Sequence, residues 1–492
     1  MTRLGNLTPP DGVVSRVRRP IVLVMAIVSV VAGTACAPDE RPGRTGDAAT
    51  DSPAEPETTT SRFPPPPAAP TGPLGDDIAA ALDDLFGSLT GVPDTAAIEF
   101  LGASGDPRVA WLLADVMRFV SPGSELLGRL VEAWSAVTGV TIEPDRSVWG
   151  TATDHLIAWD LPAPPGYVDW KRIVFEFVES GWRPFFDDAG ADIDWRLVSW
   201  GGVRIDDRPL DQTDGFCIDG CIPALNDPAL VRADTDDDWL PDDVAVFGVL
   251  VNGESVAFPK NIMQIHEMVN MTIGGRRLGI PYCTLCGSAQ AYFTDIPSTL
   301  PDDASLAVLD DQQGFELRTS GLLIRSNKVM YEFHTRSVFD TFTGRAVSGP
   351  LGAAGVVLEQ TSVLATTWGA WKSVHPDSWL IAEDGGIGRS YPPDPLRGRD
   401  DDGPIFPIGD VDPRLGVQDA VVGVVDPDGV PVAFARTSLD EADGPTTFGG
   451  ITVRPTAGGY RAEAGDGREL ATHEAFWFAW SQFHPETRLW GD

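Results

Sequence analysis

The sequence predicts an α+β protein, with a small all-α domain over residues 76–215 and a β-rich domain of two related lobes over residues 216–492. Three observations predict this class. Apolar residues recur at helical spacing in the first part, glycine-containing turns separate β-branched runs in the second, and two motifs of the second part return later in the same order. Such a separation of helical and strand periods along a chain is typical of α+β proteins.

The first 36 residues predict export. A basic stretch with Arg16, Arg18 and Arg19 comes directly before an eleven-residue apolar run from Ile21 to Val31. The run is too short to span a bilayer comfortably and is typical of a signal peptide. Gly-Thr-Ala-Cys follows, and this resembles a bacterial lipoprotein signal in which Cys36 is lipidated. We therefore expect an extracytoplasmic protein that is anchored to the cell membrane through Cys36. The alternative is plain cleavage after a small residue.

The segment behind this cysteine is rich in proline. Residues 37–75 predict an extended, disordered tether, because such a composition buries too little apolar surface to offset the entropy of the chain. The formal net charge of the whole chain is −36. A surface this acidic repels phosphate groups, which argues against nucleic acid as a partner.

The predicted helical domain carries several apolar stripes. One of them runs from Trp170 to Val178 and places Ile173 and Phe177 on an inward face. Residues 100–119 resemble a HEAT-type helical repeat, but several repeats must stack to bury a core, so a small helical domain is the simpler interpretation. Its expected role is scaffolding or contact with a protein partner.

Two hairpins are predicted in the β-rich domain, one turning at Asn252-Gly253 and one at Gly274-Gly275. Between them, residues 261–270 have helical spacing, so His266 and Asn270 are expected on one face of a helix.

This domain also contains an internal repeat. The segment VFGVLVNGESVAF returns as VVGVVDPDGVPVAF, and each copy is followed by the pattern W-x2-W-x3-H-P, which predicts a helix packed on its sheet. The repeated units are residues 244–379 and 420–490. The second unit has no cysteines, so we assign any chemistry to the first.

Four cysteines remain beyond Cys36, namely Cys217, Cys221, Cys283 and Cys286. All four together approach the spacing of a zinc ribbon. The C-x2-C pair alone favours a redox-active dithiol. The same pair joined by His266 would give a thiolate–imidazole site for copper or zinc. The fourth interpretation is structural disulfides, with Cys217–Cys221 as the best candidate.

The segments HEMVN, CTLCG and SGLLIRSNKVMY, together with the tryptophan-histidine-proline patterns, resemble an exported bacterial family, domain-of-unknown-function family 3179, over residues 216–490. The resemblance implies a secreted or lipid-anchored protein without an established activity. Thr284 stands where the family has proline, and residues 338–341 depart from its Leu-Trp-Ser-Gln segment, which puts in doubt a role for the usual serine and glutamine. The family's pattern falls on His266, Glu267, Asn270, Cys283, Cys286, Gly287, Ser320, Gly321, Ser326, Asn327, Met330 and Tyr331.

The leading hypothesis is a metal-binding or thiol-redox site built from His266, Cys283 and Cys286, with copper or zinc as the candidate metals. The side chains expected around it are Glu267, Asn270, Ser320, Asn327 and Met330. The alternative is a non-catalytic binding or scaffold module of the cell envelope with structural disulfides. The sequence itself assigns no catalytic residue and no ligand.

Overall fold

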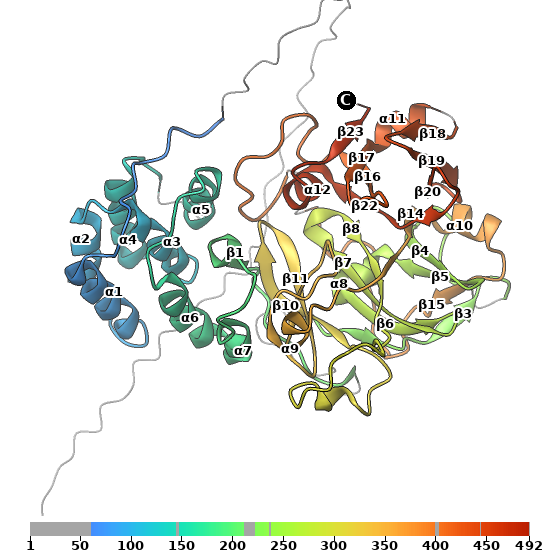
Figure 1. Cartoon of the computed structure of the whole chain (residues 1–492), viewed down its shortest axis with the longest axis horizontal. Coiled ribbons are helices and arrows are strands. Elements are labelled where there is room, and N and C mark those ends of the chain that lie inside the picture. Colours follow the sequence, from blue (N-terminus) through green and yellow to red (C-terminus); the bar gives the residue numbers. More distant parts are fainter. Residues whose placement is uncertain are drawn as a thin grey trace, which may run out of the picture.

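The computed structural model describes residues 61–143, 147–210, 222–235, 238–398, 403–442 and 444–491. Within them, a group of α-helices comes first in the chain and β-sheets follow, so the α+β class is confirmed. The helices lie on one side of the molecule and the sheets on the other (Figure 1). No described helix is both long and apolar enough to cross a membrane.

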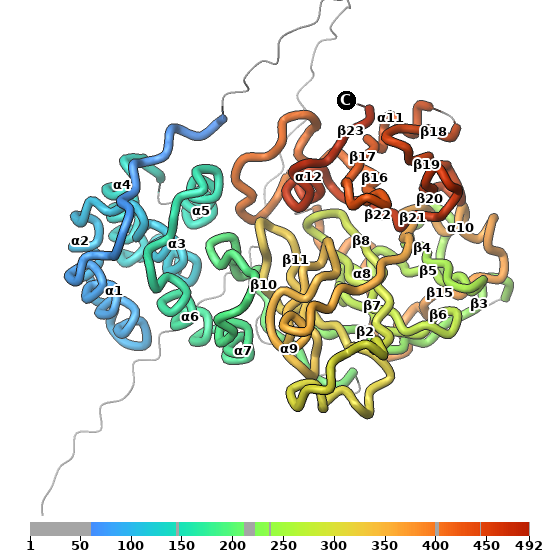
Figure 2. The backbone as a smooth tube through the Cα atoms, viewed as in Figure 1, coloured from blue at the N-terminus to red at the C-terminus, as the bar shows by residue number. Residues whose placement is uncertain are grey.

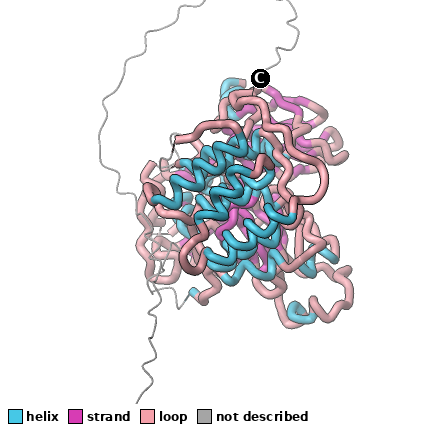
Figure 3. Tube along the Cα trace, turned by 90° about the vertical axis from the view of Figure 1, so that its left-hand side faces the viewer, coloured by secondary structure: helices cyan, strands magenta, loops and turns pink. Residues whose placement is uncertain are grey.

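The helices of the N-terminal part form a layered bundle (Figure 3). Local sequence sets their ends: the Asp94 side chain accepts the backbone N–H groups of Ala96 and Ala97, and Gly139 ends a helix in the left-handed conformation. The helices are α1 (Asp76–Ser88), α2 (Thr95–Ala103), α3 (Ala110–Met117), α4 (Glu125–Thr138), α5 (Val148–Ala158), α6 (Tyr167–Val178) and α7 (Arg183–Phe186).

The predicted inward face of α6 is partly wrong. Ile173 and Phe177 are 42% and 49% exposed, whereas Lys171 is fully buried on the opposite side. The Lys171 ammonium donates to the Asp115 carboxylate at 2.9 Å and to the Val198 carbonyl at 2.6 Å. A lysine whose ammonium has these two partners can be buried. The face of α6 that packs inward therefore includes Lys171 and leaves Ile173 and Phe177 at its exposed side.

The bundle is joined to the sheets through a common core. Trp182 and Phe185 of the helical part belong to the same buried cluster as Leu322 and Tyr331 of the β-rich part. A short strand that follows the helices, β1 (Val198–Trp200), also pairs with a strand of the β-rich part.

The β-rich part holds five sheets of four to six strands within the described residues. Their orders are β1-β10-β11-β12, β13-β9-β7-β6-β2 with β8 beside β7, β14-β4-β5-β15-β3, β22-β16-β17-β23 and β18-β19-β20-β21. The strands after β1 are β2 (Leu225–Asn226), β3 (Leu230–Arg232), β4 (Ala245–Val251), β5 (Glu254–Pro259), β6 (Met268–Ile273), β7 (Arg276–Cys283), β8 (Ser288–Ala289), β9 (Ala291–Phe293), β10 (Leu317–Ile324), β11 (Asn327–Glu332), β12 (Val338–Asp340), β13 (Gln360–Thr361), β14 (Val363–Thr367), β15 (Trp379–Ile381), β16 (Ala420–Val425), β17 (Pro431–Ala435), β18 (Thr446–Phe448), β19 (Ile451–Thr456), β20 (Gly459–Ala464), β21 (Glu469–Leu470), β22 (Thr472–Phe476) and β23 (Arg488–Trp490).

Two of these sheets have the same construction. The order β14-β4-β5-β15 matches β22-β16-β17-β23, and in both the last two strands are parallel while the others are antiparallel. A helix with the tryptophan pattern follows the first strand of each row. The second of these two sheets is formed by strands β16, β17, β22 and β23, which are coloured orange-red to red in the tube trace (Figure 2). The helices of the β-rich part are α8 (Lys260–His266), α9 (Gly349–Ala353), α10 (Trp368–Val374), α11 (Arg436–Glu441) and α12 (Trp477–Phe483).

Glycine allows these helices to approach their sheets. A Cβ atom on Gly248 would overlap the indole of Trp371, and one on Gly423 would overlap that of Trp480. The two indole N–H groups also have equivalent partners, the hydroxyls of Ser378 and Thr487, at 2.9 and 2.8 Å.

Both predicted hairpins are confirmed. Strands β4 and β5 turn at Asn252-Gly253, and β6 and β7 turn at Gly274-Gly275. The predicted helix over residues 261–270 is too long: α8 ends at His266, Glu267 takes a left-handed conformation with φ 51°, and β6 begins at Met268. Asn270 therefore lies on a strand and does not share a helix face with His266.

Candidate functional site

The C-x2-C pair forms a disulfide around a tight turn. Cys283 is the last residue of β7, a single 3₁₀ turn spans Thr284–Cys286, and Cys283 is bonded to Cys286 with a Cα–Cα distance of 5.3 Å. Gly287 follows with φ 61°, which reverses the chain into β8. A Cβ atom at Gly287 would stand 3.0 Å from the ring of Phe476, so the turn requires glycine for two reasons.

The disulfide is buried. Cys283 is 2% exposed and Cys286 is not exposed, and both lie in a cluster with Phe342, Trp477 and Trp480. The cluster thus combines the cysteines of the first repeated unit with the tryptophan helix of the second.

Polar backbone groups of the β10–β11 turn contact the sulfur atoms. The carbonyl oxygen of Ser326 lies 3.9 Å from Cys283 Sγ and 3.7 Å from Cys286 Sγ. The backbone N–H of Lys328 donates to Cys283 Sγ at 3.4 Å. On the side of this turn, the sulfur atoms therefore meet polar backbone groups.

The turn itself is strained. Arg325 and Ser326 have φ values of 47° and 68°, in the left-handed region that residues other than glycine rarely adopt. On its other side, the Arg325 N–H donates to the carbonyl of Leu197 at 3.2 Å. The turn is thus held between the disulfide and the segment that leaves the helical part.

A largely buried acid–base pair lies beside the turn between the cysteines, with side-chain exposures of 2% for Lys328 and 17% for Glu267. The Lys328 ammonium donates to the carbonyl oxygen of Glu267 and lies 3.7 Å from its carboxylate. The Thr284 hydroxyl donates to the same carboxylate at 3.1 Å. Burial raises the pKa of Glu267, and burial also lowers the pKa of Lys328 to about 8, although each partner acts in the opposite direction.

His266 does not meet the cysteines as a third ligand. Its Nδ1 lies 2.8 Å from the carbonyl oxygen of Pro223 and its Nε2 lies 2.7 Å from the hydroxyl of Tyr391, so both ring nitrogens have partners. Burial lowers the pKa of His266 to about 4 and keeps the ring neutral. Within the described ranges, no three His, Cys, Asp or Glu side chains form a group that would hold a metal ion.

The other predicted side chains separate into two groups. Glu267 and Asn327 lie near the cysteines through the contacts of Lys328 and the β10–β11 turn. Three stabilise the fold elsewhere. The Asn270 side chain accepts the N–H of Leu317 at 3.0 Å, Ser320 Oγ donates to the carbonyl of Val329 at 2.6 Å, and Met330 is buried in an apolar cluster. Cys36, Cys217 and Cys221 lie outside the described residues.

Sequence reasoning did not identify Lys328 or Ser288 as residues near the site. Ser288 lies directly opposite Cys283 in the β7–β8 pair. The side chains of Ser288 and Lys328 are both buried. The sequence carries two weak signals for these positions. Ser288 follows the period of two of a strand, and Lys328 stands next to the residues of the β10–β11 turn.

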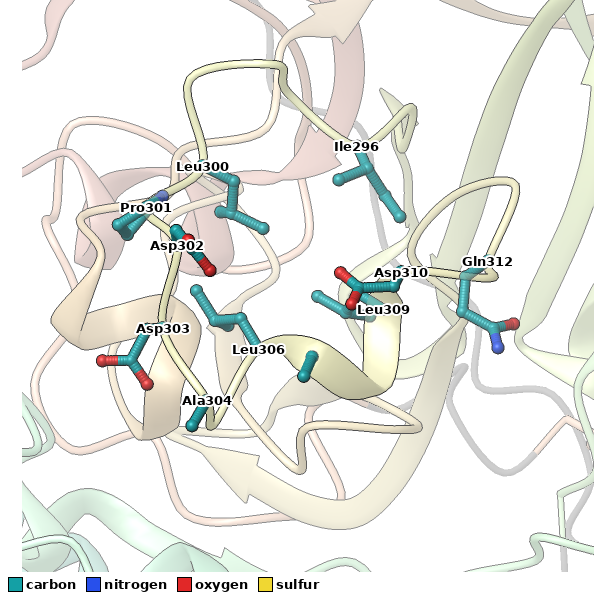
Figure 4. A pocket seen from close by; sticks show the side chains of 11 residues that line it. Ile296, Leu300, Pro301, Asp302, Asp303, Ala304, Leu306, Leu309, Asp310 and Gln312 are labelled. Atoms are coloured by element: carbon teal, nitrogen blue, oxygen red, sulfur yellow. The ribbon is translucent and has the colours of Figure 1, made fainter.

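Two hollows of the described structure lie away from the disulfide. One of about 430 Å³ is formed by the loop after β9, where Asp302, Asp303 and Asp310 surround Leu300 and Leu306 (Figure 4). None of the predicted site residues lines it.

The structure defines an α+β protein with a buried C-x2-C disulfide, which belongs to the first repeated unit and packs against the tryptophan helix of the second. Residues 219–452 match the family model described as "Protein of unknown function (DUF3179)", and this part of the chain belongs to that family. No curated protein and no solved structure matches the chain.

Proposed function

We propose that the chain is an extracytoplasmic thiol–disulfide redox protein whose Cys283–Cys286 pair cycles between disulfide and dithiol. The observation that carries this proposal is the largely buried Glu267–Lys328 pair at the turn between the two cysteines. Removing two opposite charges from water is costly, and a purely apolar staple needs neither of them.

The charged pair has the chemistry that disulfide reduction requires. Two electrons and two protons enter when a disulfide becomes two thiols, and a largely buried site has little bulk water to supply the protons. Burial raises the pKa of Glu267 and lowers that of Lys328 to about 8, and both shifts make proton exchange by these groups easier. They are therefore suited to give protons to, or take them from, the two sulfur atoms.

The size of the closed loop also favours a redox role over a structural one. In the chain-entropy account, a disulfide stabilises a fold in proportion to the logarithm of the loop it closes, and a loop of so few residues contributes only about 2 kcal/mol. The hairpins on both sides already hold this turn in place.

The cellular location is part of the same proposal. Disulfides persist outside the reducing cytosol, so the Cys283–Cys286 bond agrees with a signal at residues 1–36, a lipid on Cys36 and a tether over residues 37–75. We further propose that the two sheets of equal strand order are the centres of two lobes that arose by duplication, and that only the first lobe retains the chemistry. A role of the helical part in binding a protein partner stays a prediction.

The test uses the full-length chain. It is treated with dithiothreitol under native conditions, alkylated and analysed by mass spectrometry, while tryptophan fluorescence reports the fold. We expect two new thiols, at Cys283 and Cys286, with the fold retained, and re-formation of the bond in oxidised glutathione. Thiols that appear only when the protein unfolds would identify the pair as a staple of a non-catalytic module.

The predicted copper or zinc site at His266, Cys283 and Cys286 is tested on the same samples. Elemental mass spectrometry of the reduced, folded protein, with His266→Ala and Cys283→Ser as comparisons, measures bound metal. One equivalent that is lost in both variants would support the thiolate–imidazole ligand set.

A further inference from the structure

Two serine hydroxyls next to the disulfide have no hydrogen-bond partner in the part of the chain that the structure describes. Ser288 and Ser326 are both completely buried, and the Oγ atom of each is unpartnered. A buried hydroxyl without a partner costs about 1–3 kcal/mol. Such a group in a native structure calls for an explanation.

The strand register places the first hydroxyl beside a sulfur atom. Cys283 and Ser288 are directly opposite each other in the antiparallel β7–β8 pair, and the next pair is Tyr282 with Ala289. Directly opposite residues project to the same face with Cβ atoms about 4.5–5.5 Å apart. Tyr282 and Ala289 pack into a different apolar cluster, which confirms that Ser288 and Cys283 share the other face.

The second hydroxyl belongs to the residue whose carbonyl oxygen contacts both sulfur atoms. The carbonyl oxygen of Ser326 lies 3.7 Å from Cys286 Sγ. Two residues later, the backbone N–H of Lys328 donates to Cys283 Sγ. A disulfide sulfur carries no proton and accepts hydrogen bonds weakly. A thiolate accepts them strongly, because hydrogen bonds to ionised groups are about twice as strong, and a thiol can also donate to a carbonyl.

The Ser288 hydroxyl therefore gains a partner when the disulfide is reduced. The Cys283 thiolate would accept this hydroxyl and would hold the N–H of Lys328 more strongly than the disulfide does, and the Cys286 thiol would donate to Ser326 O. The surroundings of the sulfur atoms thus stabilise the reduced form relative to the oxidised form, and they raise the tendency of the disulfide to accept electrons.

We infer that the site is an electron acceptor, which oxidises the dithiol of a partner protein or peptide. The inference rests on the proposed redox function. A partner thiolate attacks one sulfur atom, the Cys283–Cys286 bond breaks and a mixed disulfide forms. The second thiolate of the partner then displaces it. The partner leaves as a disulfide, and its two electrons stay on Cys283 and Cys286. One of its two protons stays on the Cys286 thiol and the other is released to solvent.

Access to the sulfur atoms is through the β10–β11 turn, which lies against both of them. Because Arg325 and Ser326 both have positive φ values, opening this turn releases backbone strain. The β10–β11 turn thus covers the disulfide, and the strain released on opening it offsets part of the free energy that opening costs.

The test compares Ser288→Ala with the wild type in the full-length chain, at equilibrium with glutathione buffers of known ratio. We expect the equilibrium to shift about tenfold toward the disulfide, which is about 30 mV for this two-electron couple. The matched control is Thr294→Val, since Thr294 is also completely buried with an unpartnered hydroxyl but makes no contact with the cysteines that the structure records. The control should leave the equilibrium unchanged.

The outcomes separate this inference from the proposed function. If the wild-type disulfide cannot be reduced in the folded protein, the proposed function is wrong. If it is reduced and Ser288→Ala has the wild-type equilibrium, only the inference is overturned. Should Ser288→Ala fail to fold, Ser288→Gly, which also lacks the hydroxyl, takes its place with the same expected direction. Oxidation of a reduced dithiol peptide in a one-to-one ratio by the disulfide form would support the substrate class.

Discussion

Leu364 and His473 occupy the same position in the two repeated units. Leu364 on β14 pairs with Gly248, and His473 on β22 pairs with Gly423. Both positions are almost completely buried, with exposures of 1% and 3%. The second unit thus holds an imidazole where the first holds an apolar side chain, and the Nε2 atom of His473 has no partner among the described residues.

Replacing His473 by the residue of the first unit should stabilise the protein. His473→Leu removes an unpartnered buried Nε2, and it also removes the contact of Nδ1 with the Gln360 amide at 3.0 Å. Because Gln360 is only partly buried and can bond to water instead, we expect a net gain of about 1 kcal/mol in the free energy of unfolding, measured in urea. The reverse change, Leu364→His, should cost at least as much. A destabilised His473→Leu would mean that the Gln360 contact, or a bound partner of Nε2, contributes more than the unpartnered nitrogen costs.

Three buried histidines should each contribute stability that acid removes from about pH 6.5 downward. Burial lowers the pKa of His266 and His484 to about 4 and that of His473 to about 3. Each histidine in the unfolded chain has a pKa near 6.5, so the unfolded state binds more protons at these positions below that value. The contribution of each histidine is therefore complete above pH 6.5 and is lost as the pH falls through the folded pKa, by up to about 1.4 kcal/mol per pH unit and histidine. Glu474 acts in the opposite direction, because burial raises its pKa to about 7.

Urea unfolding at several pH values measures this loss. His473→Leu should show a smaller slope between pH 6.5 and 4 than the wild type. An identical slope in the variant would show that His473 is not held neutral by the fold.

The contact between glycine and indole should be intolerant of a methyl group. Gly423→Ala and Gly248→Ala place a Cβ atom inside the rings of Trp480 and Trp371, and we expect each to cost about 3 kcal/mol through overpacking. Gly128→Ala is the control, because it lies inside α4 with no atom within 4 Å of the added Cβ. It should stabilise the protein by about 0.5–1 kcal/mol. Thermal unfolding of the three variants decides between these signs, and a neutral Gly423→Ala would contradict the packing.

The buried pair beside the disulfide should behave as a coupled unit. Lys328→Met leaves the Glu267 carboxylate buried without its cation, and we expect a loss of about 3–5 kcal/mol. Lys328→Met combined with Glu267→Gln should lose less than the lysine variant alone. A double-mutant cycle in urea at pH 7 measures the coupling, and strictly additive losses would show that the two groups do not interact.

Much of the β-rich fold was predictable because the signals are local. Asn252-Gly253 and Gly274-Gly275 specify turns through their own backbone preferences, and the repeated tryptophan pattern marks two helices that pack in the same way. The failures come from tertiary contacts. Lys171 is buried because its ammonium contacts the carboxylate of Asp115, a residue 56 positions earlier in the chain. The helix ends at His266 because the residues that follow pair with β7 in a sheet.

The candidate site was predictable only in part for the same reason. The cysteine pair is a local motif, whereas Ser288, Ser326 and Lys328 reach it through strand register and a turn. His266 is adjacent in sequence to Glu267, which does contact the turn between the cysteines, but its own ring points to Pro223 and Tyr391. Spacing along the chain cannot distinguish these two directions.

The most direct measurement of the redox proposal is the midpoint potential of the Cys283–Cys286 pair in the folded, full-length chain. Alkylation and mass spectrometry across a series of thiol buffers give the reduced fraction, and tryptophan fluorescence reports the fold in the same samples. Structural disulfides of exported proteins have potentials below about −300 mV. The account predicts reversible reduction above that value with the fold intact. A lower potential, or reduction only on unfolding, would contradict it.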